Sequence, residues 1–245
     1  MRIFIIIRAL FKIFGRTMPG SVGMSGAVSV YDSGVRMQRQ GRLQEALDRY
    51  TEAIRLDPSL VQAYSNRGST YLNLGKPESA ITDLDEAIRL NPTLAVAYST
   101  RGLAYTNLAD FSRAVKDLNE AVRLNPNFAD AYSSRGFAHR AAGRLKRAIN
   151  DFDQAIRLDV KFSVAYNNRA DVYIEMDKPD LAMPDLDLAI KLDPGFAVAY
   201  ANRSFAWALL KNGARAKRDV EAAVKLGMDR APLEEKLEEF KERAQ

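Results

Sequence analysis

The chain of 245 residues is 47% hydrophobic and 27% charged, a composition that excludes a disordered or collagen-like protein. It has no cysteine and one histidine, which excludes a disulfide framework, a zinc site built from these residues and a cysteine nucleophile. The formal net charge is +5, but residues 1–16 contain four basic residues and no acid. Because the remainder is close to neutral, we expect no basic face for nucleic acid.

Residues 1–16 have the pattern of a short basic amphipathic helix, because their apolar side chains share one helical face and three basic side chains lie opposite. The apolar stretch is shorter than the roughly 20 residues that span a bilayer, and no signal-peptide cleavage site follows it. The pattern favours a helix on an anionic membrane surface, joined by a flexible linker to residue 26. In a second interpretation, translation starts at Met18 or Met24. The apolar residues are Ile3, Ile6, Ile7, Leu10 and Phe14.

From residue 27 onward, a pattern of aromatic, small and proline residues recurs every 34 residues. The blocks are 27–60, 61–94, 95–128, 129–162, 163–196 and 197–230. Two consecutive blocks contain Tyr64, Gly68, Tyr71, Gly75, Ala80, Ala87 and Pro92, and then Tyr98, Gly102, Tyr105, Ala109, Ala114, Ala121 and Pro126. Such a period is typical of a repeat protein.

Each block is predicted to form two antiparallel helices, with a turn at Gly75 and a helix-ending residue at Pro92 in the second block. Gly68 and Ala80 are small where the two helices would come closest. One hairpin cannot bury its own apolar face, so neighbouring hairpins must stack. The pattern, with Y-x-x-R-G in its first half, resembles the bacterial type of tetratricopeptide repeat. This resemblance implies an all-α, right-handed superhelical solenoid of six helix-turn-helix repeats.

An arginine at the seventh position of five blocks is followed sixteen residues later by an aspartate. Both lie eight residues from the turn, so we predict an ion pair across each hairpin; an anion-binding row of arginines is the alternative. Acids four residues before bases, such as Asp85 before Arg89, predict further pairs on the outer face. The pairs across the hairpins are Arg67–Asp83, Arg101–Asp117, Arg135–Asp151, Arg169–Asp185 and Arg203–Asp219.

No catalytic constellation is visible in the sequence. His139, the single histidine, occupies a position that is tyrosine in other blocks, so we expect a packed side chain. No glycine-rich phosphate loop is present, and the carboxylates belong to the pairing patterns. We therefore expect neither an enzyme nor a cofactor nor a metal site. In the fifth block, Asp177 replaces the turn glycine and Pro184 falls inside the second helix, which predicts the weakest hairpin.

The family resemblance further implies a concave groove, lined by the first helix of each repeat, that binds an extended or helical segment of another protein. The leading alternative is a membrane-tethered assembly factor anchored through residues 1–16. We expect a cytoplasmic monomer, with association at the inner membrane face and self-association as alternatives. The implied groove residues are Gln62, Ser65, Asn66, Ser69, Asn73, Ser99, Thr100, Asn107, Ser133, Ser134, Arg140, Asn167, Asn168, Asp171 and Asn202.

Residues 231–245 are predicted to form a capping helix after the sixth block. Leu233, Leu237 and Phe240 would make a narrow apolar stripe, and the acids between them would face solvent. An open array of repeats needs such a polar cover on its last apolar face. A seam for self-association is the alternative use of the same stripe.

Overall fold

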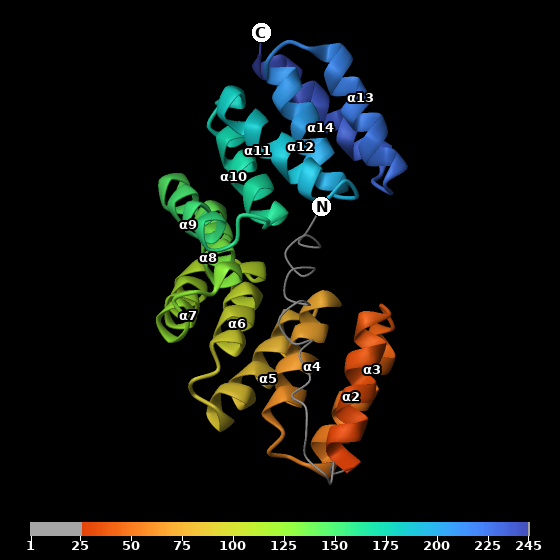
Figure 1. The fold of residues 1–245 in the computed structure, drawn as a ribbon, viewed down its shortest axis with the longest axis vertical. Helices are drawn as coiled ribbons and strands as arrows, with labels where there is room; N and C mark the ends of the chain where they lie inside the picture. The colour runs from red at the N-terminus through yellow and green to blue at the C-terminus, as the bar shows by residue number, and fades with distance from the viewer. Residues whose placement is uncertain (1–25, 245) are drawn as a thin grey trace. The chain divides into compact units, whose positions relative to one another are not determined.

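The computed structural model describes residues 26–244. Within this range the chain forms thirteen α-helices, α2 to α14, and no β-strand (Figure 1). The prediction of an all-α protein with six consecutive helix pairs and one C-terminal helix is confirmed. The predicted amphipathic helix in residues 1–16 lies outside the described residues.

Each helix pair consists of a first helix, a short turn and a second helix. The pairs are α2 (Gly26–Arg39) and α3 (Leu43–Leu56), α4 (Val61–Asn73) and α5 (Pro77–Leu90), α6 (Ala95–Asn107) and α7 (Phe111–Leu124), α8 (Ala129–Ala141) and α9 (Leu145–Leu158), α10 (Ser163–Glu175) and α11 (Pro179–Leu192), and α12 (Ala197–Leu209) and α13 (Gly213–Lys225). The last helix is α14 (Arg230–Arg243). Proline begins α5 and α11, where its missing N–H would have no intrahelical partner.

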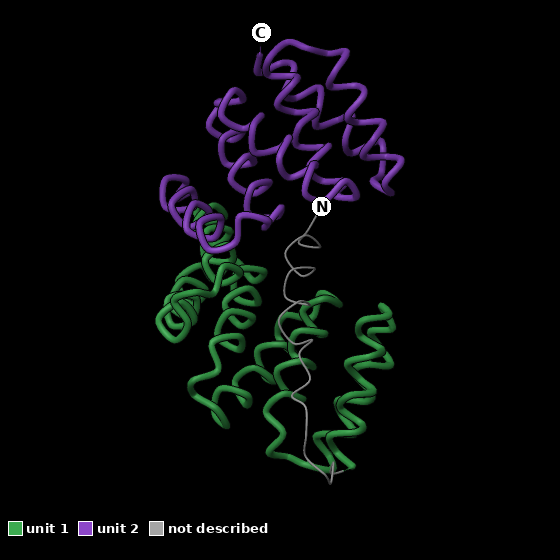
Figure 2. Tube along the Cα trace, in the orientation of Figure 1, with its two compact units in different colours: residues 1–142 green, residues 143–245 purple. Residues whose placement is uncertain are grey.

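The chain divides into two compact units, residues 1–142 and 143–245 (Figure 2). The first unit contains α2 to α8 and the second contains α9 to α14. Within each unit the helices pack in chain order, as α4, α5 and α6 do in the first and α10, α11 and α12 do in the second. First helices of adjacent repeats also touch, α4 with α6 and α10 with α12. Each unit therefore builds its core by stacking one hairpin on the next.

Small residues let the two helices of a hairpin approach closely. A Cβ atom on Gly68 would lie 2.9 Å from Leu84 Cγ, and one on Gly102 would lie 2.6 Å from Leu118 Cγ. The Gly68 position also lies 3.2 Å from the carbonyl oxygen of Ala80, whose side chain is fully buried. The predicted close approach at Gly68 and Ala80 is confirmed. A larger side chain there would push the helices apart.

The turn between the helices of a hairpin needs one residue with a positive φ. In the second repeat this residue is Gly75, at 70°. The next amide, of Lys76, donates to the carbonyl oxygen of Tyr71 at 2.9 Å and so closes the end of α4. Three turns place a residue with a Cβ atom in this left-handed conformation, which costs free energy that glycine avoids. These residues are Ala109 (58°), Asp177 (55°) and Lys211 (56°).

The last helix covers the end of the second unit. Leu233, Leu237 and Phe240 are buried, with exposed fractions of 1%, 6% and 7%. The acidic residues Glu234 and Glu238 are exposed on the other side of α14. The predicted capping helix is therefore confirmed.

Candidate functional site

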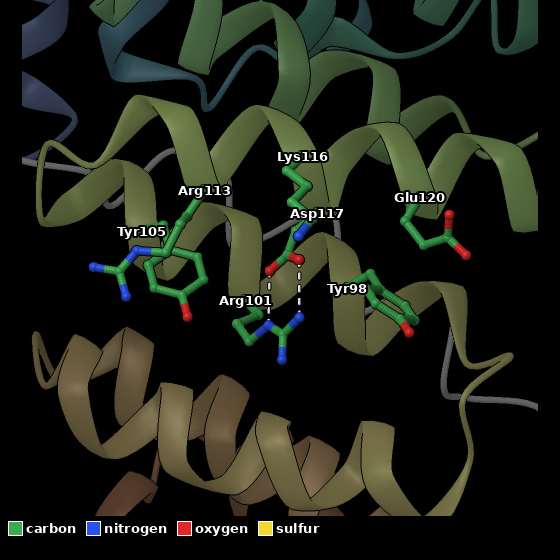
Figure 3. A pocket seen from close by; sticks show the side chains of 7 residues that line it. All are labelled: Tyr98, Arg101, Tyr105, Arg113, Lys116, Asp117 and Glu120. Atoms are coloured by element: carbon green, nitrogen blue, oxygen red, sulfur yellow. Dashed lines mark hydrogen bonds and ion pairs between the residues drawn. The ribbon is translucent and has the colours of Figure 1, made fainter.

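The arginine and the aspartate predicted to pair across each hairpin do so in four repeats. Arg101 Nε and Nη2 donate to Asp117 Oδ2 and Oδ1 at 2.7 and 2.8 Å, a two-pronged ion pair visible in Figure 3. The other three pairs with this geometry are Arg67–Asp83, Arg169–Asp185 and Arg203–Asp219. Residues 135 and 151, the members of the remaining predicted pair, lie in different units, and that pair stays a prediction.

The same arginines reach the second helix of the preceding repeat, a bond that the sequence analysis missed. Arg101 Nη1 donates to Asp85 Oδ1 at 2.6 Å, and Arg203 Nη1 donates to Asp187 Oδ1 at 2.7 Å. The acceptor stands sixteen residues before the arginine and always carries a side-chain oxygen, a signal that could have revealed it. We call these linked side chains the arginine ladder. Its other bonds of this kind are Arg67–Thr51 at 3.0 Å, Arg135–Asn119 at 2.8 Å and Arg169–Asp153 at 2.5 Å.

The predicted outer-face pair of Asp85 with Arg89 is wrong. Asp85 is held by Arg101 instead, and Arg89 pairs with Glu86, three residues before it, at 2.6 Å. The ladder outcompetes the pair within one helix because its arginine is only 18% exposed and already fixed by Asp117, so a second bond costs little further side-chain entropy.

Tyrosine three residues before the arginine explains the Y-x-x-R part of the repeated pattern. The guanidinium carbon of Arg101 lies 5.5 Å from the centre of the Tyr98 ring, and that of Arg203 lies 5.6 Å from the Tyr200 ring. This is the range of a cation–π interaction. The hydrogen bonds that Arg203 donates to Asp219 raise the pKa of Arg203 above its ordinary value, against the opposing effect of burial. Arg203 therefore stays charged at neutral pH, and its hydrogen bonds and ring contact indicate a structural role.

A cavity of about 450 Å³ lies beside the ladder in the third repeat (Figure 3). Arg101 is committed to two carboxylates, and Arg113 pairs with Asp110 at 2.6 Å while its guanidinium lies 4.4 Å from the Tyr105 ring centre. Three basic and two acidic side chains line the cavity, and both arginines are held in ion pairs. Its lining residues are Tyr98, Arg101, Tyr105, Arg113, Lys116, Asp117 and Glu120.

The predicted groove residues fall into two groups by exposure. The buried ones are Ser65, Asn66, Ser99, Thr100, Ser133, Ser134, Asn167, Asn168 and Asn202. Those that reach the surface are Gln62, which is exposed, and Ser69, Asn73, Asn107, Arg140 and Asp171, which are half-buried. The structure thus brings only the second group to a face that a partner could touch without moving a helix.

Several buried residues of this set join first helices of adjacent repeats. Asn66 Nδ2 donates to Tyr31 Oη at 2.9 Å, and Asn202 Nδ2 donates to Asn167 Oδ1 at 3.0 Å. Both bonds span 35 residues, from the sixth position of one block to the fifth position of the block before. Burial raises the pKa of Tyr31 to about 12, so its hydroxyl stays protonated at neutral pH. These side chains stabilise the stacking of repeats.

Asparagines end α4 and α6 at equivalent positions on the first-helix face. Asn73 and Asn107 are both half-buried, and the two helices touch. Within residues 26–244, neither Asn73 Oδ1 nor Asn107 Oδ1 accepts a hydrogen bond. The hydroxyl oxygens of Ser65 and Ser99, on the same helices, likewise have no partner in that range. Buried polar atoms in native proteins are nearly always bonded, so these oxygens are spare acceptors that a partner could reach only after a side chain rotates.

Neither a membrane-spanning helix nor a metal cluster is found in the part of the chain that the structure describes. No helix there is long and apolar enough to cross a bilayer. No group of three or more histidine, aspartate or glutamate side chains there could hold a metal ion. His139 is 6% exposed and lies within α8.

Four family models match the chain. One, described as TPR repeat, matches residues 39–75, and three, described as tetratricopeptide repeat, match residues 61–94, 99–161 and 163–196. Together they span more than half of the chain. A search of curated proteins found no match.

Solved structures of low sequence identity share the fold. A tetratricopeptide repeat protein from Parabacteroides merdae is 24% identical, with a TM-score of 0.73 over 96% of this chain and 90% of that one. The thermophilic protein TTC0263 from Thermus thermophilus is 21% identical, with a TM-score of 0.68 over 74% of this chain and 98% of that one. YrrB, described as having an unusual peptide-binding site, is 20% identical, with a TM-score of 0.53 over 78% and 97%.

Proposed function

This chain belongs to the tetratricopeptide repeat family, and from that premise we propose that it is a non-catalytic scaffold that binds a segment of another protein. The contact surface would be the face that α4 and α6 share in the first unit. The ligand would be an extended or helical segment without a strong net charge, because the reachable residues there are neutral and polar: Gln62, Ser69, Asn73 and Asn107.

The observation that carries the proposal is the repeated asparagine at the end of α4 and α6. A carboxamide group both donates and accepts, so Asn73 and Asn107 could each hold the N–H and C=O groups of a bound backbone. Their Oδ1 atoms are buried and have no partner within residues 26–244, so rotation of either side chain toward a ligand would gain a bond without breaking another. Recognition of a backbone by paired amides would tolerate many side chains, as a scaffold requires.

Two further points support this proposal. YrrB, which shares the fold, has a peptide-binding site, a precedent for this activity on such a framework. Four charged side chains that line the cavity of the third repeat, Arg101, Arg113, Asp117 and Glu120, already form ion pairs, which supports a structural role for them. Both points favour binding of a protein segment as the function.

The test is selection of peptides from a displayed random library on the full-length chain. Asn73→Ala combined with Asn107→Ala should weaken the selected peptides about tenfold, or about 1.4 kcal/mol, through the loss of two hydrogen bonds. The matched control is Asn150→Ala on the exposed surface of α9, which should leave the affinity unchanged. Buried Asn66 and Ser99 are unsuitable for this test because changes there disturb helix packing. Equal binding to all variants would refute the α4–α6 face.

The second candidate is a membrane-tethered assembly factor, favoured by the basic amphipathic pattern of residues 1–16. The tether predicts that the full-length chain sediments with vesicles containing anionic lipid and that a chain starting at Met24 stays in the supernatant. High salt should release the bound form, because the attraction to anionic lipid is screened. Sedimentation of neither form would remove the tether.

A further inference from the structure

The C-terminal helix does more than cover the end of the array. The aromatic ring of Phe240 stacks on that of Phe205 in α12, with centroids 5.1 Å apart and an interplanar angle of 23°. Leu233 and Leu237 join the same apolar cluster, together with Ala201 of α12. Ala201 and Phe205 stand at the fifth and ninth positions of their block, two of the positions that the family resemblance assigns to the groove.

The orientation of α14 places it across this face. It packs chiefly on α12 and much less on α13, the helix that precedes it in the chain. Near its start, Arg230 pairs with Glu221 of α13 at 2.7 Å. At its end, Arg243 pairs with Asp177, which lies in the turn after α10 and belongs to repeat five. The helix therefore begins at the second helix of repeat six and ends beside the first helix of repeat five.

Charged side chains of α14 add to its contacts with the face of α12 that contains Ala201 and Phe205, which we call the seat. Lys236 Nζ lies 5.0 Å from the ring centre of Phe205, and the guanidinium carbon of Arg243 lies 4.7 Å from that of Phe240. Both are in cation–π range, but only the contact of Lys236 with Phe205 joins α14 to α12, so this face favours a base four residues before the aromatic residue. Asp177 forms an ion pair with Arg243, the last basic residue of α14. The pattern that fills the seat is Leu233, Leu237, Phe240 and Arg243, at spacings of four, three and three.

The attachment of α14 is suited to release. Four residues, 226–229, connect it to α13, and among them Gly227 has a φ of 97° that few other residues adopt. The face of α14 turned away from α12 is acidic and exposed, as at Glu234 and Glu238. Among the described residues, a narrow apolar stripe, the contact of Lys236 with Phe205 and an ion pair near each end hold the helix.

We infer that the first-helix face of α10 and α12 is a groove for an amphipathic helix, and that α14 is its internal competitor. The partner is a helix of another protein that repeats the stripe, two aliphatic residues four apart, then an aromatic residue three further on and a basic residue three beyond it. Such a helix would displace α14 and take over its contacts with Phe205 and Asp177. This inference rests on the proposed function, since it assigns a second binding face to the same scaffold.

The probe is a fluorescent peptide with the sequence of residues 229–245, titrated against the full-length chain. Binding should be weak to the unaltered chain, because α14 competes at very high effective concentration. Phe240→Ala with Arg243→Ala in the chain should strengthen peptide binding at least about tenfold. The matched control, Glu235→Ala with Glu239→Ala on the exposed side of α14, should leave it unchanged. Equal binding of the peptide to all three chains, or no binding to any, would overturn the inference.

A second measurement covers the case in which the altered chain fails to fold. The chain has no cysteine, so Asp177→Cys with Arg243→Cys can be joined by a short bis-maleimide without side reactions. Peptide binding should fall after cross-linking, and amide exchange in α14 of the unaltered chain should be at least tenfold faster than in α12. Exchange in α14 as slow as in α12 would show a fixed cap and overturn the proposal. Because neither readout involves Asn73 or Asn107, failure here and failure of the α4–α6 proposal are distinguishable.

Discussion

The first-helix face of α4 and α6 and that of α10 and α12 are built on the same framework and differ in what they present. In both units an arginine pairs with two second helices and lies over a tyrosine ring. At the ninth position, repeat two has Ser69 and repeat six has Phe205; at the thirteenth, they have Asn73 and Leu209. The first face carries half-buried asparagines whose buried Oδ1 atoms have no partner within residues 26–244, whereas the second buries its aromatic ring under α14. The residues at a few positions of the first helix therefore decide whether the face of a repeat is polar or aromatic, and so which kind of partner it can bind.

Replacing the ninth residue of a repeat by alanine should give the largest difference between the two faces in the free energy of unfolding. Phe205 is 3% exposed and stacked on Phe240, so Phe205→Ala should lower the free energy of unfolding by about 3–5 kcal/mol. Ser69 occupies the equivalent position but is half-buried, so Ser69→Ala should change it by less than about 0.5 kcal/mol. Urea denaturation followed by circular dichroism measures both. Equal losses would mean that the two faces do not differ in what covers them.

Breaking the arginine ladder should affect both units alike. Asp117→Ala in the first unit and Asp185→Ala in the second each leave a largely buried arginine with one partner fewer, which should cost about 3 kcal/mol. The control is Asp85→Ala, which removes the other partner of Arg101. Its carboxylate is 55% exposed, so the loss should stay below about 1 kcal/mol. A much larger loss in one unit than in the other would contradict a shared framework.

The sequence predicted the pair within a hairpin because a hairpin is locally symmetric. Arg101 and Asp117 lie equally far from one turn, so their spacing alone places them together. The bond to Asp85 crosses repeats and depends on how two hairpins stack, although the sixteen-residue offset was readable. The groove residues stay a prediction, and the burial of the fifth and sixth positions, such as Ser99 and Thr100, likewise depends on how hairpins stack.

The placement of α14 on α12 was beyond what its sequence could specify. The stripe of Leu233, Leu237 and Phe240 predicts that the helix is buried along one side, and this is confirmed. It does not say whether that side meets α12 or α13. The choice depends on Phe205, whose ring offers a partner for Phe240, and on the reach of Arg243 to repeat five.

Alkaline pH should destabilise the first unit through a hydrogen bond that the second unit lacks. Within each unit an asparagine joins two first helices, but the acceptors of the two bonds differ. In the first unit Asn66 donates to Tyr31, whose pKa is raised by burial to about 12, from an ordinary value near 10. The folded state favours the neutral phenol, so this contribution is complete below pH 10 and is lost as the pH rises toward 12. The loss should reach about 2 kcal/mol. In the second unit the acceptor is the amide of Asn167, which does not titrate.

Tyr31→Phe is the variant that checks this pH dependence. It should cost about 1 kcal/mol at pH 8, from the lost hydrogen bond, and should reduce the further fall between pH 8 and 11. Urea denaturation at pH 8, 10 and 11 provides the comparison. Burial also raises the pKa of Tyr50, in the same repeat, so part of the alkaline fall should persist. An unchanged fall in Tyr31→Phe would assign the alkaline loss to other groups.

The smallest expected changes in stability come from glycine substitutions at the turns. They measure how much the ion pair of Arg243 with Asp177 contributes to holding α14 at repeat five. Ala109→Gly and Lys211→Gly relieve a positive φ and should each stabilise the chain by about 0.5–1 kcal/mol. Asp177→Gly relieves the same strain but removes the partner of Arg243, so its gain should be smaller by the worth of that exposed pair, up to about 1 kcal/mol. In an Arg243→Ala background the three gains should become equal. If Asp177→Gly stabilises the unaltered chain as much as the other two substitutions do, the ion pair of Arg243 with Asp177 does not hold the end of α14 at repeat five. The two faces would then differ only in their apolar and amide side chains.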